Sequence, residues 1–131
     1  MSEISDVLII DVSGKIDYRN KKYCVCISVS PDKYFLINTN HREIYDDFEI
    51  KSSNYAFLEN VNRFVCCSKM YEFDPGRIIR KAGNLNFDDM MKIIDKIQKS
   101  RVIGKKEKDS VIPALDKWQS ENCVNYVPDT A

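Results

Sequence analysis

The stretch that decides the fold reads Tyr23-Cys-Val-Cys-Ile-Ser-Val29, then Ser30-Pro-Asp-Lys33, then Tyr34-Phe-Leu-Ile-Asn-Thr39. The two outer runs are rich in β-branched and aromatic residues, which favour extended backbone. The Pro-Asp pair between them is typical of a turn. Two such runs around a short turn predict an antiparallel hairpin.

Shorter runs on both sides of this hairpin also have strand character. Apolar residues fill 7–12, and polar and apolar residues alternate over 47–51. A further strand is predicted over 63–69, and 70–73 either continues it or forms the next one. Several short strands at close spacing favour a barrel or sandwich over a parallel sheet.

The pattern changes to helical after residue 86. Apolar residues at helical spacing predict a helix over 87–99, with Asn86 as its N-cap and Asp88 and Asp89 at the positive end of its dipole. Residues 104–109 are expected to form a charged loop. A short second helix should follow, with Ser110 to Pro113 near its start and Trp118 on its buried side. The tail, 122–131, is polar and expected to be loose.

We therefore expect a mainly β fold with C-terminal helices (α+β), built as a small curved antiparallel barrel. Residues 1–100 would form the barrel and its helix. Residues 101–131 would be a charged linker, a short helix and a tail, packed on or extending from the same domain. A length of 131 residues suits one hydrophobic core.

Composition argues against a membrane protein, a secreted protein and a thiolate metal site. The chain has zero formal net charge and 44% hydrophobic residues, and it shows neither a membrane-length apolar run nor a signal-peptide pattern. It has five cysteines, an odd number, without CxxC spacing, which predicts buried free thiols in a reducing cytoplasm and no thiolate metal site. We expect a soluble cytoplasmic protein that does not enter a membrane and holds no metal or cofactor.

Polar residues gather where the two strands of the hairpin end. Arg19, Lys21 and Lys22 precede the first strand, and a second group follows the other strand: Thr39, Asn40, His41 and Arg42. In a strongly curved antiparallel sheet these ends would converge on one rim, where cations and hydroxyls can hold a phosphodiester. The alternative is that His41 and Arg42 belong to a solvated turn.

Three segments carry a resemblance to a known family. They are Asp6-Val-Leu-Ile-Ile10, Lys22-Tyr-Cys-Val-Cys-Ile-Ser28 and Phe35-Leu-Ile-Asn-Thr39, and they resemble the first strands of PemK/MazF-type toxins. Later, Asn62–Cys67 and Ile78–Leu85 resemble the strands that precede the family's C-terminal helix. The resemblance covers roughly residues 5–100.

This resemblance implies an SH3-like barrel, commonly a homodimer, that cleaves single-stranded RNA without a metal and is restrained by an antitoxin protein. Thr39 matches the family's active-site threonine, and Lys22 stands where the family has a catalytic arginine, with Arg19 nearby as a substitute. Lys21, Asn40, His41 and Arg42 would then bind the substrate, and His41 or Arg42 would also assist proton transfer.

Two other functions remain open from the sequence. A non-catalytic module that binds protein or nucleic acid on the same barrel is favoured by the neutral charge, by lysine in place of arginine at Lys22, and by the acidic residues of 43–49. Alternatively, residues 101–131 cover the groove of the same chain and regulate it.

Overall fold

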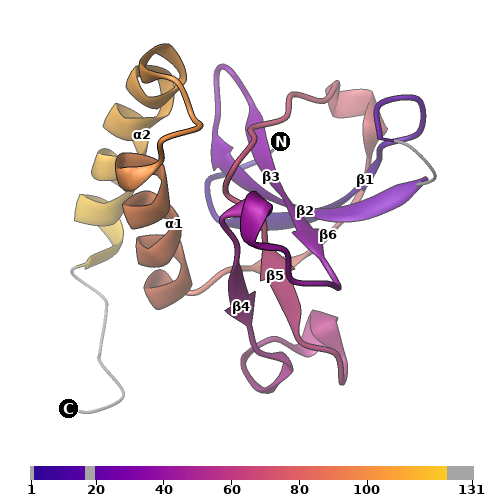
Figure 1. The fold of residues 1–131 in the computed structure, drawn as a ribbon. Coiled ribbons are helices and arrows are strands. Elements are labelled where there is room, and N and C mark those ends of the chain that lie inside the picture. Colours follow the sequence, from indigo (N-terminus) through magenta and orange to yellow (C-terminus); the bar gives the residue numbers. More distant parts are fainter. Residues whose placement is uncertain (1, 17–19, 124–131) are drawn as a thin grey trace.

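The computed structural model describes residues 2–16 and 20–123. A single sheet forms the centre of the fold, and two helices stand side by side against it (Figure 1). None of the helices in these residues combines the length and the apolar character needed to cross a membrane.

Within the described residues the sheet has six strands, and every pairing between them is antiparallel. Its order is β4-β5-β3-β2-β1-β6. The bounds are β1 (Asp6–Asp11), β2 (Lys21–Ser28), β3 (Lys33–Asn38), β4 (Phe48–Ile50), β5 (Arg63–Val65) and β6 (Ile78–Asn84). Four 3-10 helices lie between strands: η1 (Glu43–Tyr45), η2 (Ser52–Asn54), η3 (Ala56–Leu58) and η4 (Pro75–Arg77).

The predicted mainly β fold with C-terminal helices is confirmed. The structure does not show closure of the sheet into a barrel, because β4 and β6 are its edges and no pairing of described residues joins them. Register shifts interrupt the β1–β6 and β2–β3 ladders. Bulges of this kind bend and twist a sheet.

The hairpin β2–β3 forms as predicted, with Tyr23 opposite Ile37 and Val25 opposite Phe35. The strand predicted over 63–69 ends earlier, at Val65. The Cys66 N–H still bonds to Leu36 O of β3, but the Cys67 N–H bonds to Tyr45 O, so the regular ladder cannot continue. Residues 70–73 contribute only an isolated bridge, between Tyr71 and Tyr34.

The first helix, α1 (Phe87–Lys99), has the predicted bounds. Its N-cap is Asn86, whose Oδ1 accepts a 2.8 Å hydrogen bond from the Asp89 N–H. This bond satisfies one of the amide groups that a helix start leaves without a partner.

The second helix is longer than predicted and begins earlier in the chain. It is α2 (Lys105–Cys123), so the expected charged loop over 104–109 is mostly helix, and Pro113 lies inside it. Lys and Glu are good helix formers. Val111 and Leu115 are fully buried in the same core as α1, and this packing maintains the helix through a proline that lacks one backbone donor. The predicted loose tail lies largely in 124–131, outside the described residues.

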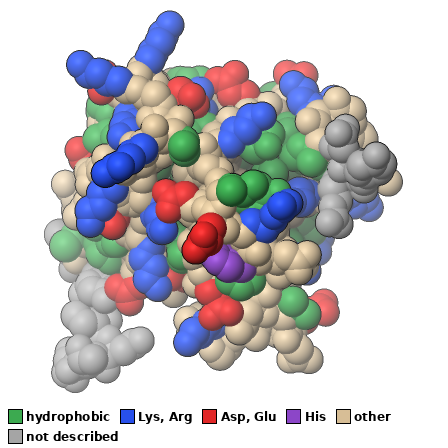
Figure 2. Space-filling view, in the orientation of Figure 1, with side chains coloured by type: hydrophobic (Ala, Val, Ile, Leu, Met, Phe, Trp, Pro, Cys, Tyr) green, Lys and Arg blue, Asp and Glu red, His purple; other side chains and the backbone are tan. Residues whose placement is uncertain are grey.

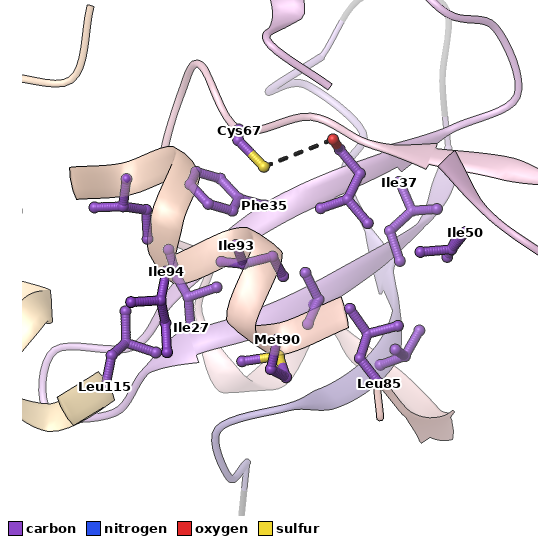
Figure 3. Packing of buried hydrophobic residues seen from close by; sticks show 14 of the residues in the cluster. Ile27, Phe35, Ile37, Ile50, Cys67, Leu85, Met90, Ile93, Ile94 and Leu115 are labelled. Carbon is purple, nitrogen blue, oxygen red and sulfur yellow. Dashed lines mark hydrogen bonds between the residues drawn. The ribbon is translucent and has the colours of Figure 1, made fainter. Parts of the chain in front are cut away.

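Two hydrophobic clusters hold the sheet between them. The larger one joins one face of the sheet to both helices: Ile27, Phe35 and Ile37 meet Met90, Ile93 and Ile94 of α1 (Figure 3). The smaller one covers the opposite face and includes Ile10, Cys24, Cys26, Tyr34 and Phe73. Because alternate residues of a strand point to opposite faces, β2 contributes to both clusters.

A close approach at Gly83 supports the first prediction. A Cβ on Gly83 would lie 2.8 Å from Cδ1 of Phe57. We expect Gly83→Ala to lower the free energy of unfolding by about 1–3 kcal/mol, because the Phe57 ring must move. Denaturant unfolding measures this, with Gly76→Ala as control, since no atom lies within 4 Å of a Cβ placed there. Equal stability of the two variants would contradict this contact.

Thiol reactivity supplies the second prediction. Cys24, Cys26, Cys66 and Cys67 are buried, whereas Cys123 is exposed. Burial raises the pKa of Cys24 and Cys26 to about 12 and that of Cys66 to about 11, and it also raises the pKa of Cys67. Since the thiolate is the reactive form, an aromatic disulfide reagent at neutral pH should label Cys123 alone in the folded protein. Fast labelling of several thiols would show that the cores are open.

Candidate functional site

A cleft of about 560 Å³ lies where β2 begins and β3 ends. These two strands are antiparallel neighbours, so the start of one and the end of the other share one edge of the sheet. The cleft is lined by Ile9, Ile16, Lys21, Lys22, Tyr23, Ile37, Asn38, Thr39, Asn40, Arg42, Tyr45 and Arg63.

Most of the residues singled out in the sequence meet here. Lys21 and Lys22 come from β2, and Thr39, Asn40 and Arg42 follow β3. The predicted convergence of the two strand ends is thus observed, while the roles of these residues remain predictions. His41 is not among the lining residues, and Arg19 lies outside the described residues.

Among the cleft residues that the sequence did not indicate are Arg63, Tyr23 and Tyr45. Arg63 begins β5, which pairs with β3, and this pairing carries it to the cleft. Tyr23 belongs to the predicted hairpin, and Tyr45 lies in η1. No local motif marks Arg63, because its position depends on a pairing between segments far apart in the chain.

The lining is basic. Among the described residues that line the cleft are Lys21, Lys22, Arg42 and Arg63, and none of these described lining residues is Asp or Glu. Across the face shown in Figure 2, by comparison, basic and acidic side chains are interspersed. Lysines elsewhere pair with carboxylates at Lys33, Lys81, Lys92, Lys96, Lys99 and Lys117. The cleft is therefore a local positive site on a chain of zero net charge.

The two arginines of the cleft have aromatic neighbours and no carboxylate partner. Arg42 lies over the Tyr45 ring, 5.6 Å from its centroid, and Arg63 lies over the Tyr23 ring at 5.0 Å. Neither side chain enters an ion pair with a described residue. Basic and aromatic side chains in one groove are the combination that binds single-stranded nucleic acid.

Two of the acidic residues expected near this groove, Asp46 and Asp47, make contacts elsewhere. The Asp47 side chain is fully buried, 2.5 Å from Nδ1 of His41, and it accepts a 3.0 Å hydrogen bond from the Arg42 N–H. Asp46 pairs with Lys96 of α1 at 2.8 Å, and this hydrogen bond raises the pKa of Lys96. Asp46 and Asp47 thus fasten the loop that carries Arg42, and neither lines the cleft.

Lys22 is held in place from within the sheet. Its Nζ donates to Oδ1 of Asn38, and Nδ2 of Asn38 donates to the Cys66 Sγ at 3.0 Å. The raised pKa of Cys66 keeps that sulfur a neutral thiol near pH 7, and the main cause is its burial. Asn38 therefore sets the position of the Lys22 ammonium group at the edge of the cleft.

The described part of the chain contains no group of three or more His, Cys, Asp or Glu side chains placed to hold a metal ion. No residue of 101–123 lines the cleft; α2 instead packs against α1 and the larger core. Over its described residues, the C-terminal extension does not cover the groove. Comparison with known proteins gave no match, either to a family model or to a curated protein.

The buried carboxylate of Asp47 gives the third prediction. We expect Asp47→Ala to lower the free energy of unfolding by about 1–3 kcal/mol, because the Arg42 N–H and the His41 ring lose their partner. Urea unfolding measures this loss. The control is Glu49→Ala, an exposed carboxylate two residues along the chain. If both variants unfold at the same urea concentration, Asp47 does not hold the loop.

Proposed function

We propose that the protein is a PemK/MazF-like endoribonuclease that binds single-stranded RNA in the cleft and cleaves it without a metal ion. The observation that carries this proposal is the lining itself, whose described residues include four basic residues, two tyrosines and no acidic residue. Cations bind the phosphate backbone, and aromatic rings stack on bases.

Cleavage would proceed by attack of a ribose 2′-oxygen on the adjacent phosphorus. The bond from phosphorus to the 5′-oxygen breaks, giving a 2′,3′-cyclic phosphate and a free 5′-hydroxyl. The proton lost by the 2′-hydroxyl goes to a base, and the departing 5′-oxygen takes a proton from an acid. Negative charge grows on the phosphoryl oxygens, so fixed cations lower the barrier.

The residues of the cleft match these needs in part. Lys22 and Arg42 would stabilise the phosphoryl oxygens, and the Thr39 hydroxyl would hold the phosphate in position. A guanidinium keeps its proton in proteins, so Arg42 is suited to charge stabilisation rather than proton transfer. His41 stands between two lining residues, Asn40 and Arg42, without lining the cleft itself. Because its Nδ1 faces Asp47, it would exchange a proton through Nε2.

A second candidate is an RNA-binding module that does not cleave. It is favoured by the position of His41, which contacts Asp47 and the Phe64 ring and does not line the cleft. An antitoxin that covers the cleft and a homodimer are further proposals that rest on the family resemblance alone.

The fourth prediction separates these functions. The protein is incubated with a mixed RNA pool in EDTA beside the Lys22→Ala/Thr39→Ala variant. We expect cleavage by the unmodified protein and a rate at least about 100-fold lower for the variant, because it lacks a cation and a hydroxyl donor at the phosphate.

The matched control is Lys51→Ala/Ser53→Ala, which removes an exposed lysine and an exposed hydroxyl outside the cleft. It should cleave like the unmodified protein. Equal cleavage by the Lys22/Thr39 variant would remove these residues from the mechanism. RNA binding without cleavage by any form would favour the non-catalytic module.

A further inference from the structure

Arg63, which lines the cleft, differs in its contacts from Arg77, which is hydrogen-bonded to the backbone. Arg77 donates from Nη1 to two backbone oxygens, those of Asp11 at 3.1 Å and Ser13 at 2.9 Å. The Arg63 side chain enters no ion pair within the described residues, and its Nε is buried without an acceptor. The guanidinium carbon lies over the Tyr23 ring, 5.0 Å from its centroid. Unlike Arg77, the Arg63 guanidinium is thus positioned by an aromatic ring and not by hydrogen bonds to the backbone.

The surroundings of Arg63 are apolar on one side. Tyr23 pairs directly with Ile9 of β1 and with Ile37 of β3, so the three side chains lie in a row on one face of the sheet. All three line the cleft together with Arg63. Lys22 is next to Tyr23 in β2, and Asn38 is next to Ile37 in β3, so both belong to the opposite face of the sheet. The cleft therefore has an apolar, aromatic side and a polar, cationic side.

We propose that Arg63 and Tyr23 form a base-stacking platform for single-stranded RNA. A nucleobase stacks on the guanidinium plane of Arg63, which Tyr23 supports from below, while the phosphates lie against Lys21, Lys22 and Arg42. This inference rests on the proposed function, because it requires the cleft to bind RNA. The apolar, aromatic side of the cleft would contact the base, and the polar, cationic side would contact the phosphates.

The platform is held rigidly before any ligand arrives. The Tyr23 hydroxyl donates to Phe57 O at 3.3 Å, and the two rings lie 5.5 Å apart. Phe57 in turn packs closely over Gly83. Arg63 stands two residues before Val65, which is fully buried in the larger core. A preorganised aromatic surface loses little conformational entropy on binding.

The fifth prediction compares two ligands that differ only in their bases. One is a mixed-sequence RNA octamer with 2′-O-methyl groups, which cannot undergo 2′-attack; the other is an octamer of abasic spacers with the same phosphates. Affinities are measured in EDTA by fluorescence anisotropy. We expect the protein to prefer the octamer with bases by about 5- to 100-fold.

The informative variant is Arg63→Lys, which keeps the charge and removes the planar group. It should lose most of the preference for bases and keep its affinity for the abasic octamer. The control is Arg80→Lys, the same change at an exposed position of β6 outside the cleft, and it should keep the preference. Thermal unfolding of each variant verifies that it is folded.

Three results would overturn the platform, and they are distinguishable. Equal binding of both octamers by the unmodified protein removes the platform but leaves a phosphate-binding cleft. An unchanged preference in Arg63→Lys removes Arg63 from base binding. Binding of neither octamer overturns the proposed function together with the platform.

Discussion

The antiparallel pairing of β2 with β3 is the constraint on which the rest of the structure depends. It places the first residues of β2 beside the last residues of β3, so that Lys22 and Asn38 come within hydrogen-bonding reach. The same pairing sets Tyr23 opposite Ile37 and Val25 opposite Phe35, which directs both strands into the larger core. One register thus determines both the cleft and the surface that α1 covers. A shift by one residue would exchange the two faces.

The remaining elements hold the cleft open and positive. The buried Asp47 carboxylate fixes the loop after β3, and Asp46 ties that loop to α1 through Lys96. Tyr55 joins the same helix to the segment before β5: its hydroxyl donates to Asp89 at 2.5 Å and accepts from the Asn86 N–H at 3.0 Å. Burial raises the pKa of Tyr55 and keeps it protonated as a donor. Asp46 and Asp47 therefore serve the fold, and neither pairs with Arg42 or Arg63 of the cleft through an ion pair.

Features set by residues close together in the chain were predictable from the sequence, and features set by distant residues were not. The helix over 87–99 and its Asn86 cap were predictable, because the apolar period and the cap lie within one segment. The start of α2 was not, since its charged first turns resemble a loop and only the burial of Val111 and Leu115 explains the helix. The end of β5 at Val65 has a similar reason. The N–H of Cys67, two residues later, bonds to Tyr45 O, which lies far away in the chain.

The sequence by itself determined the hairpin, the mainly β character with C-terminal helices, and the polar residues that border the cleft. Only the tertiary structure decided the strand order, the inward turn of Asp47, and the arrival of Arg63 beside Tyr23. The physical reason is that periodicity, turns and caps act within a few residues. Strand pairing joins residues that are far apart in the chain, and no local pattern specifies which strands will pair.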